Sequence, residues 1–215
     1  LFVFMGLLTG CIQENGLIIE NHEIPGIEFS PTPFQPGNLS IYLSNSIPES
    51  WVDILKENAS IDVVDNKTSA NLILSLSPSG ANQNDLGNFV RVYAVAAQFP
   101  TAYDAITSDE LKGLWGGQKA TNFSRLLVSE ATRKSLEEFW SAPPSSLVSV
   151  VLPDEMLDEA WKDPSTLAII PFEEISPRWK VLKINGISPL DKPMDLSGYP
   201  LALTYHLVGV TDGLD

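Results

Sequence analysis

The stretch FVRVYAVAA, residues 89–97, is rich in β-branched and aromatic residues and predicts a strand. Strand and helix patterns alternate on both sides of it. Leu39–Leu43 alternates apolar with polar residues as a strand does, and Pro48 then precedes a helix predicted at Glu49–Asn58. Further strands are predicted at 70–76, 125–128, 147–152, 167–170 and 179–184, and further helices at 109–115, 130–140 and 153–161. This alternation indicates an α/β fold in which helices cover parallel sheets.

The N-terminal segment LFVFMGLLTGC, residues 1–11, joins an apolar run to the single cysteine of the chain. The run fits the apolar part of a secretory signal and is too short to span a bilayer. Its last four residues resemble a bacterial lipobox, in which lipid is attached to the cysteine. We therefore expect residues 1–10 to be a truncated lipoprotein signal peptide and Cys11 to be lipidated. The alternative is a buried first strand with a core cysteine.

Residues 11–37 are predicted to hold the acylated cysteine and a flexible linker, because apolar residues are too sparse there to offset the entropy of ordering. The formal net charge of −14 at pH 7 argues against nucleic acid as a partner. The first basic residue after Cys11 is Lys56, so the acyl groups must supply the contact with membrane lipid. We expect an extracytoplasmic protein that is lipid-anchored to the bacterial cell envelope.

The globular part, residues 38–215, resembles a type 2 periplasmic-binding-protein fold of the phosphate-binding sort. The stretches that carry the resemblance are VRVYAVAAQFPT (90–101), TSDELKGLWGGQ (107–118), SRLLVSEATRKSLEEF (124–139), STLAIIPFEEI (165–175), WKVLKINGISP (179–189) and GYPLAL (198–203). The order of these stretches carries the resemblance more than any one of them. It implies two lobes with parallel or mixed sheets, joined near residues 92–100 and again in the late strands. It also implies a solute held between the lobes.

In that family, helix N-termini and loop hydroxyls meet a small, often anionic ligand. The physical reason is that the first N–H groups of a helix are unpaired and the dipole there is positive. We expect such groups from three stretches: Ser44, Asn45 and Ser46; Ser77 and Ser79; and Ser129 and Thr132. Arg125 is expected to add a fixed positive charge. The alternative is that they are ordinary caps and turn residues. Glu130 stands where the family has glycine, which favours a neutral, cationic or peptide-like ligand, or an empty cleft.

Catalytic and metal-binding patterns are absent from the sequence. His22 and His206 have no partner at metal-ligand spacing, and no nucleophile elbow, phosphate loop or dinucleotide motif occurs. We predict no catalytic residue, metal or cofactor. Adjacent acidic pairs are interpreted as solvated: Glu137 with Glu138, Asp154 with Glu155, and Glu173 with Glu174. Tryptophans near element ends are predicted to pack in the core: Trp115, Trp140, Trp161 and Trp179.

Two functions follow from the sequence. The first is a noncatalytic, lipid-tethered binding module, either a solute receptor that serves a transporter permease or a sensor-like domain. The second rests on IIPFEEISPRWKVL (169–182) and YPLALTYHL (199–207), which resemble the region before the catalytic domain of CapA-type proteins. That resemblance implies a role in capsule or poly-γ-glutamate synthesis, with a metallophosphoesterase-like domain following Asp215.

Overall fold

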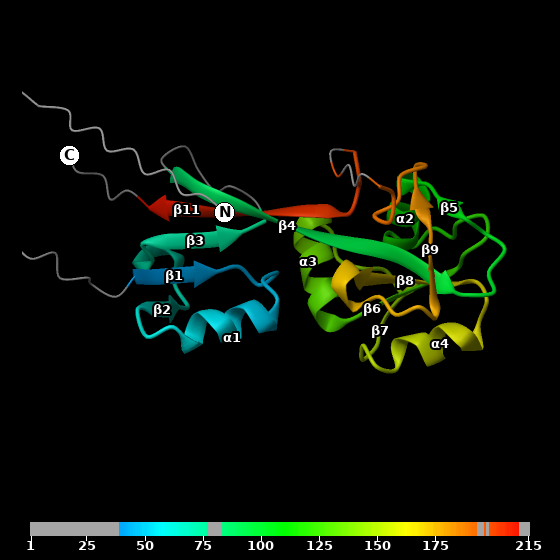
Figure 1. Ribbon diagram of the computed structural model, residues 1–215, viewed down its shortest axis with the longest axis horizontal. Coiled ribbons are helices and arrows are strands. Elements are labelled where there is room, and N and C mark those ends of the chain that lie inside the picture. The colour runs from blue at the N-terminus through cyan, green and yellow to red at the C-terminus, as the bar shows by residue number, and fades with distance from the viewer. Residues whose placement is uncertain (1–38, 77–82, 193–195, 197, 211–215) are drawn as a thin grey trace, which may run out of the picture. The chain divides into compact units, whose positions relative to one another are not determined.

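The computed structural model describes residues 39–76, 83–192, 196 and 198–210 (Figure 1). Cys11, the predicted linker, Ser77 and Ser79 lie outside the described residues. The described chain forms two lobes: in the first, a sheet packs with α1, and in the second, a sheet packs with α2, α3 and α4. The predicted two-lobed α/β fold is confirmed. No helix in the described ranges is long and apolar enough to cross a membrane.

The first lobe has the strand order β2–β1–β3–β11–β4. Its elements are β1 (Leu39–Leu43), α1 (Glu49–Glu57), β2 (Ile61–Val64), η1 (Lys67–Ser69), β3 (Leu72–Ser75), the first half of β4 (Gln83–Gln98), and β11 (Ala202–Val210). Strand β1 is parallel to both β2 and β3. Strand β11 is antiparallel to both β3 and β4, so the sheet is mixed.

The second lobe continues with the strand order β4–β8–β6–β7, and β9 also pairs with β4. Its elements are the second half of β4, α2 (Ser108–Trp115), β6 (Arg125–Val128), α3 (Glu130–Trp140), β7 (Val148–Val150), α4 (Met156–Lys162), β8 (Thr166–Pro171), η2 (Phe172–Glu174) and β9 (Trp179–Val181). A separate pair of short parallel strands consists of β5 (Ala105–Ile106) and β10 (Lys183–Ile184). Because β6, β7 and β8 are parallel, their carboxyl ends meet at one edge.

The long strand β4 belongs to both lobes. It pairs with β11 as far as Val92, opposite Ala202, and from Tyr93 onward it pairs with β8 and then β9. At this switch the Tyr93 N–H donates to the Leu201 carbonyl at 3.0 Å. The Tyr199 hydroxyl donates to the Tyr93 carbonyl at 2.9 Å. The outgoing and returning segments are therefore hydrogen-bonded to each other where the chain passes between the lobes (Figure 1).

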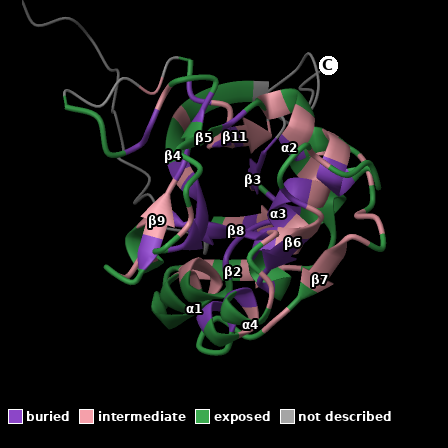
Figure 2. Cartoon of the chain, turned by 90° about the vertical axis from the view of Figure 1, so that its right-hand side faces the viewer, coloured by how far each residue is buried: buried purple, intermediate pink, exposed green. Residues whose placement is uncertain are grey.

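The core of the second lobe is centred on β8, whose six residues are all buried. Alternate side chains enter two clusters, because successive residues of a strand point to opposite faces. Leu167 and Ile169 pack with residues of α2 and α3, whereas Ala168 and Ile170 pack with residues of α4. Figure 2 shows buried residues concentrated on β8 and β6 between these helices. Each buried leucine or isoleucine contributes roughly 1.5–3 kcal/mol to folding.

Several elements differ from the sequence predictions. Strand β4 begins at Gln83, six residues before the predicted Phe89, because pairing with β11 holds a polar segment of low strand propensity in the sheet. The strand predicted at 179–184 is interrupted at Leu182 and becomes β9 and β10. The prediction that Trp161 packs in the core is wrong, because this residue is 46% exposed. Trp115 is buried and makes an edge contact with the Trp140 ring at 5.0 Å between centroids.

Candidate ligand-binding cleft

The starts of two helices from different lobes line one cavity of about 400 Å³. The first turn of α1 belongs to the first lobe and the first turn of α3 to the second. The remaining lining comes from Arg91, from the end of β7 and the loop after it, from the end of β8 and from η2. The complete lining is Pro48, Glu49, Ser50, Arg91, Ser129, Glu130, Ala131, Val150, Val151, Leu152, Pro153, Pro171 and Glu174. We call this cavity the cleft.

Helix α3 begins at the cleft because Ser129 caps it directly after the buried strand β6. The Ser129 hydroxyl accepts a hydrogen bond from the Thr132 N–H at 3.2 Å and donates to the Thr132 hydroxyl at 2.9 Å. Both side chains are buried and paired with each other. The N–H groups of Glu130 and Ala131 precede the first hydrogen bond within the helix, so they remain available to a ligand.

Helix α1 begins after Pro48, which lacks a side chain able to cap it. The Val52 N–H donates to the Pro48 carbonyl at 3.1 Å, so helical hydrogen bonding starts there. The N–H groups of Glu49 and Ser50 therefore precede the first helical bond, as in α3. Both helices bring the positive end of a dipole to the same cavity, an arrangement that attracts negative charge.

The buried guanidinium of Arg91 supplies the positive side chain of the cleft. It is 8% exposed and lies at the end of the β4 segment that pairs with β11. Its Nε and Nη2 donate to Glu173 Oε1 at 3.0 and 2.8 Å, and Nη2 lies 3.6 Å from Glu174 Oε1. Its Nη1 donates to the Tyr93 hydroxyl at 3.4 Å. Most of its donors therefore already have partners within the protein.

Carboxylates outnumber cations around the cleft. Glu49, Glu130 and Glu174 line it together with Arg91. Glu130 is drawn toward Arg133, which donates to its two oxygens at 2.7 and 2.9 Å, and hydrogen bonding with Arg133 lowers the pKa of Glu130. Burial raises the pKa of Glu174, and Arg91 offsets this only in part. The helix starts thus face a cavity whose side chains are acidic overall.

A buried hydrogen-bond network joins the lobes beneath the cleft. The Ser135 hydroxyl of α3 donates to the Ser46 carbonyl at 2.9 Å, and the Tyr205 hydroxyl of β11 donates to the same carbonyl at 3.2 Å. The Tyr93 hydroxyl donates to Ser135 Oγ at 3.1 Å and also accepts from Arg91. Burial raises the pKa of Tyr205, which keeps it a neutral donor. This network fixes Arg91 relative to both lobes.

The structure brings only some of the predicted ligand residues together. Ser129 lines the cleft, and Thr132 lies buried beneath it. Ser44 and Asn45 line a different cavity, of about 450 Å³, with Lys56 and Lys134. Ser46 is buried, and its hydroxyl lies 2.8 Å from that of Ser44.

Arg125 lies at the amino end of β6, opposite the end that leads to Ser129. It donates to the Ser149 hydroxyl at 3.2 Å, pairs with Glu159 at 3.6 Å and is absent from the cleft lining. Arg91 was missed from the sequence because its partner Glu173 is 82 positions away. The pair Glu173 and Glu174 is exposed as expected but holds this arginine.

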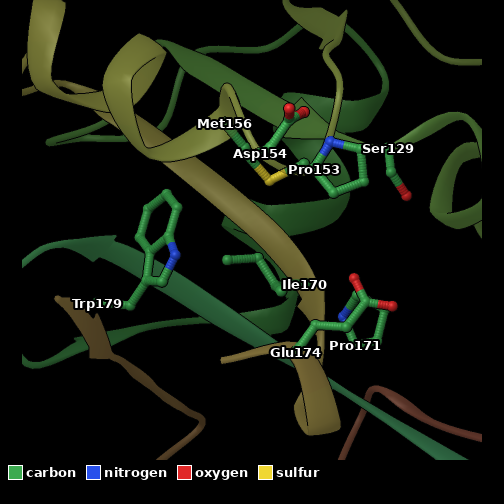
Figure 3. Close-up of a pocket in the computed structure, with 8 residues that line it drawn as sticks. All are labelled: Ser129, Pro153, Asp154, Met156, Ile170, Pro171, Glu174 and Trp179. Atoms are coloured by element: carbon green, nitrogen blue, oxygen red, sulfur yellow. The ribbon is translucent and has the colours of Figure 1, made fainter. Parts of the chain in front are cut away.

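A second cavity of about 370 Å³ adjoins the cleft (Figure 3). The two share Ser129, Pro153, Pro171 and Glu174. Its other lining residues are Asp154, Met156, Ile170 and Trp179. We call it the side cavity. Among the described residues, no cluster of three or more histidine, cysteine, aspartate or glutamate side chains is arranged to hold a metal.

Comparison with known proteins gives the fold. The sequence matches no protein-family model and no curated protein at a significant level. An ABC-type phosphate transport receptor from Vibrio cholerae has a TM-score of 0.59 at 16% identity, over 82% of this chain and 88% of that one. The fold is that of a type 2 periplasmic binding protein. A possible phosphate binding protein from Planctomyces limnophilus has a TM-score of 0.58 at 10% identity, over 80% of this chain and 81% of that one. PstS from Borrelia burgdorferi has a TM-score of 0.55 at 12% identity, over 80% of this chain and 86% of that one.

Proposed function

We propose that this chain is a noncatalytic solute-binding domain that acts outside the cytoplasm and is tethered to the envelope by acyl groups on Cys11. The observation that carries the proposal is the meeting of two helix starts, from α1 and α3, with the buried Arg91 at one interlobe cavity. Pockets with a few convergent polar groups are the usual form of small-molecule sites. The fold likeness to a phosphate transport receptor supports delivery of the solute to a transporter permease.

The charges of the cleft favour a ligand other than free phosphate. A multiply charged anion needs cationic donors, but Arg91 gives two hydrogen bonds to Glu173. Glu49 and Glu174 face the same space and repel an anion. The N–H groups at the two helix starts suit a single carboxylate or a neutral polar group better.

A thermal-shift screen of the purified domain tests ligand binding. Anions, sugars, amino acids and peptides would be added singly. A ligand at a hundredfold excess over its dissociation constant stabilises the folded state by about 2.7 kcal/mol. Ala131→Phe places a ring in the cleft from an exposed position and should abolish the shift, whereas Ala102→Phe, at an exposed position outside the cleft lining, should retain it. Flat melting curves for all compounds, or an unaffected Ala131→Phe variant, would refute the proposal.

Lipid attachment is tested on the full chain in a bacterial host. Cys11→Ala should move the protein from the membrane fraction to the soluble fraction, because two or more acyl chains anchor a protein stably. Mass spectrometry of the membrane-bound wild type should find lipid on Cys11. Membrane retention of the variant without any lipid on the wild type would contradict the anchor.

The alternative function is that this same domain precedes the catalytic domain of a CapA-type protein. Its two stretches, 169–182 and 199–207, form β8, η2, β9 and much of β11, and they include the glutamates that hold Arg91. They therefore fit the binding-protein fold equally well. Metal-dependent phosphodiesterase activity in the natural gene product, retained after Ala131→Phe, would favour this alternative and place catalysis in a further domain.

A further inference from the structure

The side cavity lies next to the cleft. The residues that line both spaces are Ser129, Pro153, Pro171 and Glu174, so a molecule held at the start of α3 would lie beside the side cavity. The two volumes, about 400 and 370 Å³, each lie within the range of small-molecule sites. All of the side-cavity lining comes from the second lobe.

The lining of the side cavity combines apolar walls with acidic ends. Trp179, Met156 and Ile170 are buried and belong to the same apolar cluster against α4. Figure 3 shows Asp154 beside Met156 and Pro153 at one end, with Glu174 beside Pro171 at another. Asp154 and Glu174 are the charged members of the lining, and both are acidic.

The two carboxylates differ in their partners. Arg91, the cation paired with Glu174, lies 3.6 Å from it and makes its shorter bonds, at 2.8 and 3.0 Å, to Glu173. Within the described part of the chain, Asp154 has no ion-pair partner. An indole and two carboxylates that line the same cavity attract organic cations, because the ring face is electron-rich and a carboxylate supplies negative charge.

We propose that the side cavity binds an organic ammonium group carried by the ligand that occupies the cleft. This inference rests on the proposed solute-binding function and adds the chemical class of the ligand. A hard metal ion fits worse, since it needs six or more oxygen ligands and the walls here are tryptophan, methionine, isoleucine and proline. A ligand with a carboxylate and an ammonium group would satisfy both ends: its carboxylate lies at the helix starts and its ammonium group lies in the side cavity.

The test compares choline with its neutral carbon isostere, in which a quaternary carbon replaces the nitrogen. Binding is followed through the indole N–H signal of Trp179 in nitrogen-edited NMR of the intact domain, assigned with Trp179→Phe among the five tryptophans. Choline should shift this signal in a saturable way. The isostere should bind at least about tenfold more weakly, which corresponds to the loss of one charge-assisted contact.

Single carboxamide variants complete the experiment. Glu174→Gln and Asp154→Asn should each weaken choline binding by about tenfold. Asp158→Asn removes an exposed charge from α4 that does not line the cavity, and should leave binding unchanged. Equal binding of choline and its isostere, unchanged affinity in both carboxamide variants, or an unmoved Trp179 signal would overturn the proposal. If another compound binds the cleft in the thermal screen while choline leaves Trp179 unmoved, only the ammonium site is refuted.

Discussion

Replacing Ser135→Ala is expected to lower the free energy of unfolding by about 2 kcal/mol, because it removes the centre of the interlobe network. Ser135 Oγ donates to the Ser46 carbonyl at 2.9 Å and accepts from the Tyr93 hydroxyl at 3.1 Å. Ser46 O keeps a second donor in Tyr205, at 3.2 Å. The Tyr93 hydroxyl loses its acceptor in a residue with no exposed surface, and a buried group left unpaired costs about 1–3 kcal/mol.

Urea unfolding followed by tryptophan fluorescence and by circular dichroism measures this change. For a domain of this size, about 2 kcal/mol corresponds to a melting temperature lower by roughly 4–8 °C. The matched control is Ser146→Ala, at an exposed serine, which should stay within about 0.5 kcal/mol of wild type. If Ser135→Ala unfolds like this control, the hydroxyl does not join the lobes as described.

Three further changes test other parts of the structure. Leu167→Ala, at a fully buried position of β8, should destabilise by about 2–5 kcal/mol in the same urea assay. Ser129→Ala removes the α3 cap and should lower the free energy of unfolding by about 1 kcal/mol. On heating, the helical circular dichroism signal should then be lost at a lower temperature than in the wild type. Burial raises the pKa of Glu174, so the folded state holds its proton more tightly than the unfolded state, and stability should fall as pH rises from the ordinary glutamate pKa through the raised one. Glu174→Gln should remove that slope, as urea midpoints across this pH range would reveal.

Local sequence signals predicted most elements of the fold. The Thr107 hydroxyl and Glu110 form a capping box at α2, and Ser129 caps α3, so both helix starts were found within one residue. Strand β2 was missed because it is a four-residue edge strand that includes Asp62 and follows a loop. The polar first half of β4 was missed because only its pairing with the distant β11 makes it a strand. Tertiary pairing decided both cases.

The candidate site was less predictable than the fold. Ser129 was found because a cap after a buried strand is a local pattern. Arg91 was passed over since nothing near it in the sequence indicates that a strand arginine is buried or that Glu173 receives it. Arg125 was expected to add a fixed positive charge to the site, yet it stands at the opposite end of β6 from Ser129. In a parallel sheet the carboxyl ends of the strands form the ligand edge, which strand direction alone would have indicated.

The most direct test of the cleft is an amide NMR titration of the intact domain with a compound identified by the thermal screen. Ser50 at the start of α1 and Ala131 at the start of α3 belong to different lobes but line the same cavity. Their N–H signals should shift together along one binding curve with a single dissociation constant. Shifts confined to one lobe, or shifts of Ser44 and Asn45 in the neighbouring cavity while Ser50 and Ala131 stay unmoved, would contradict an interlobe ligand site.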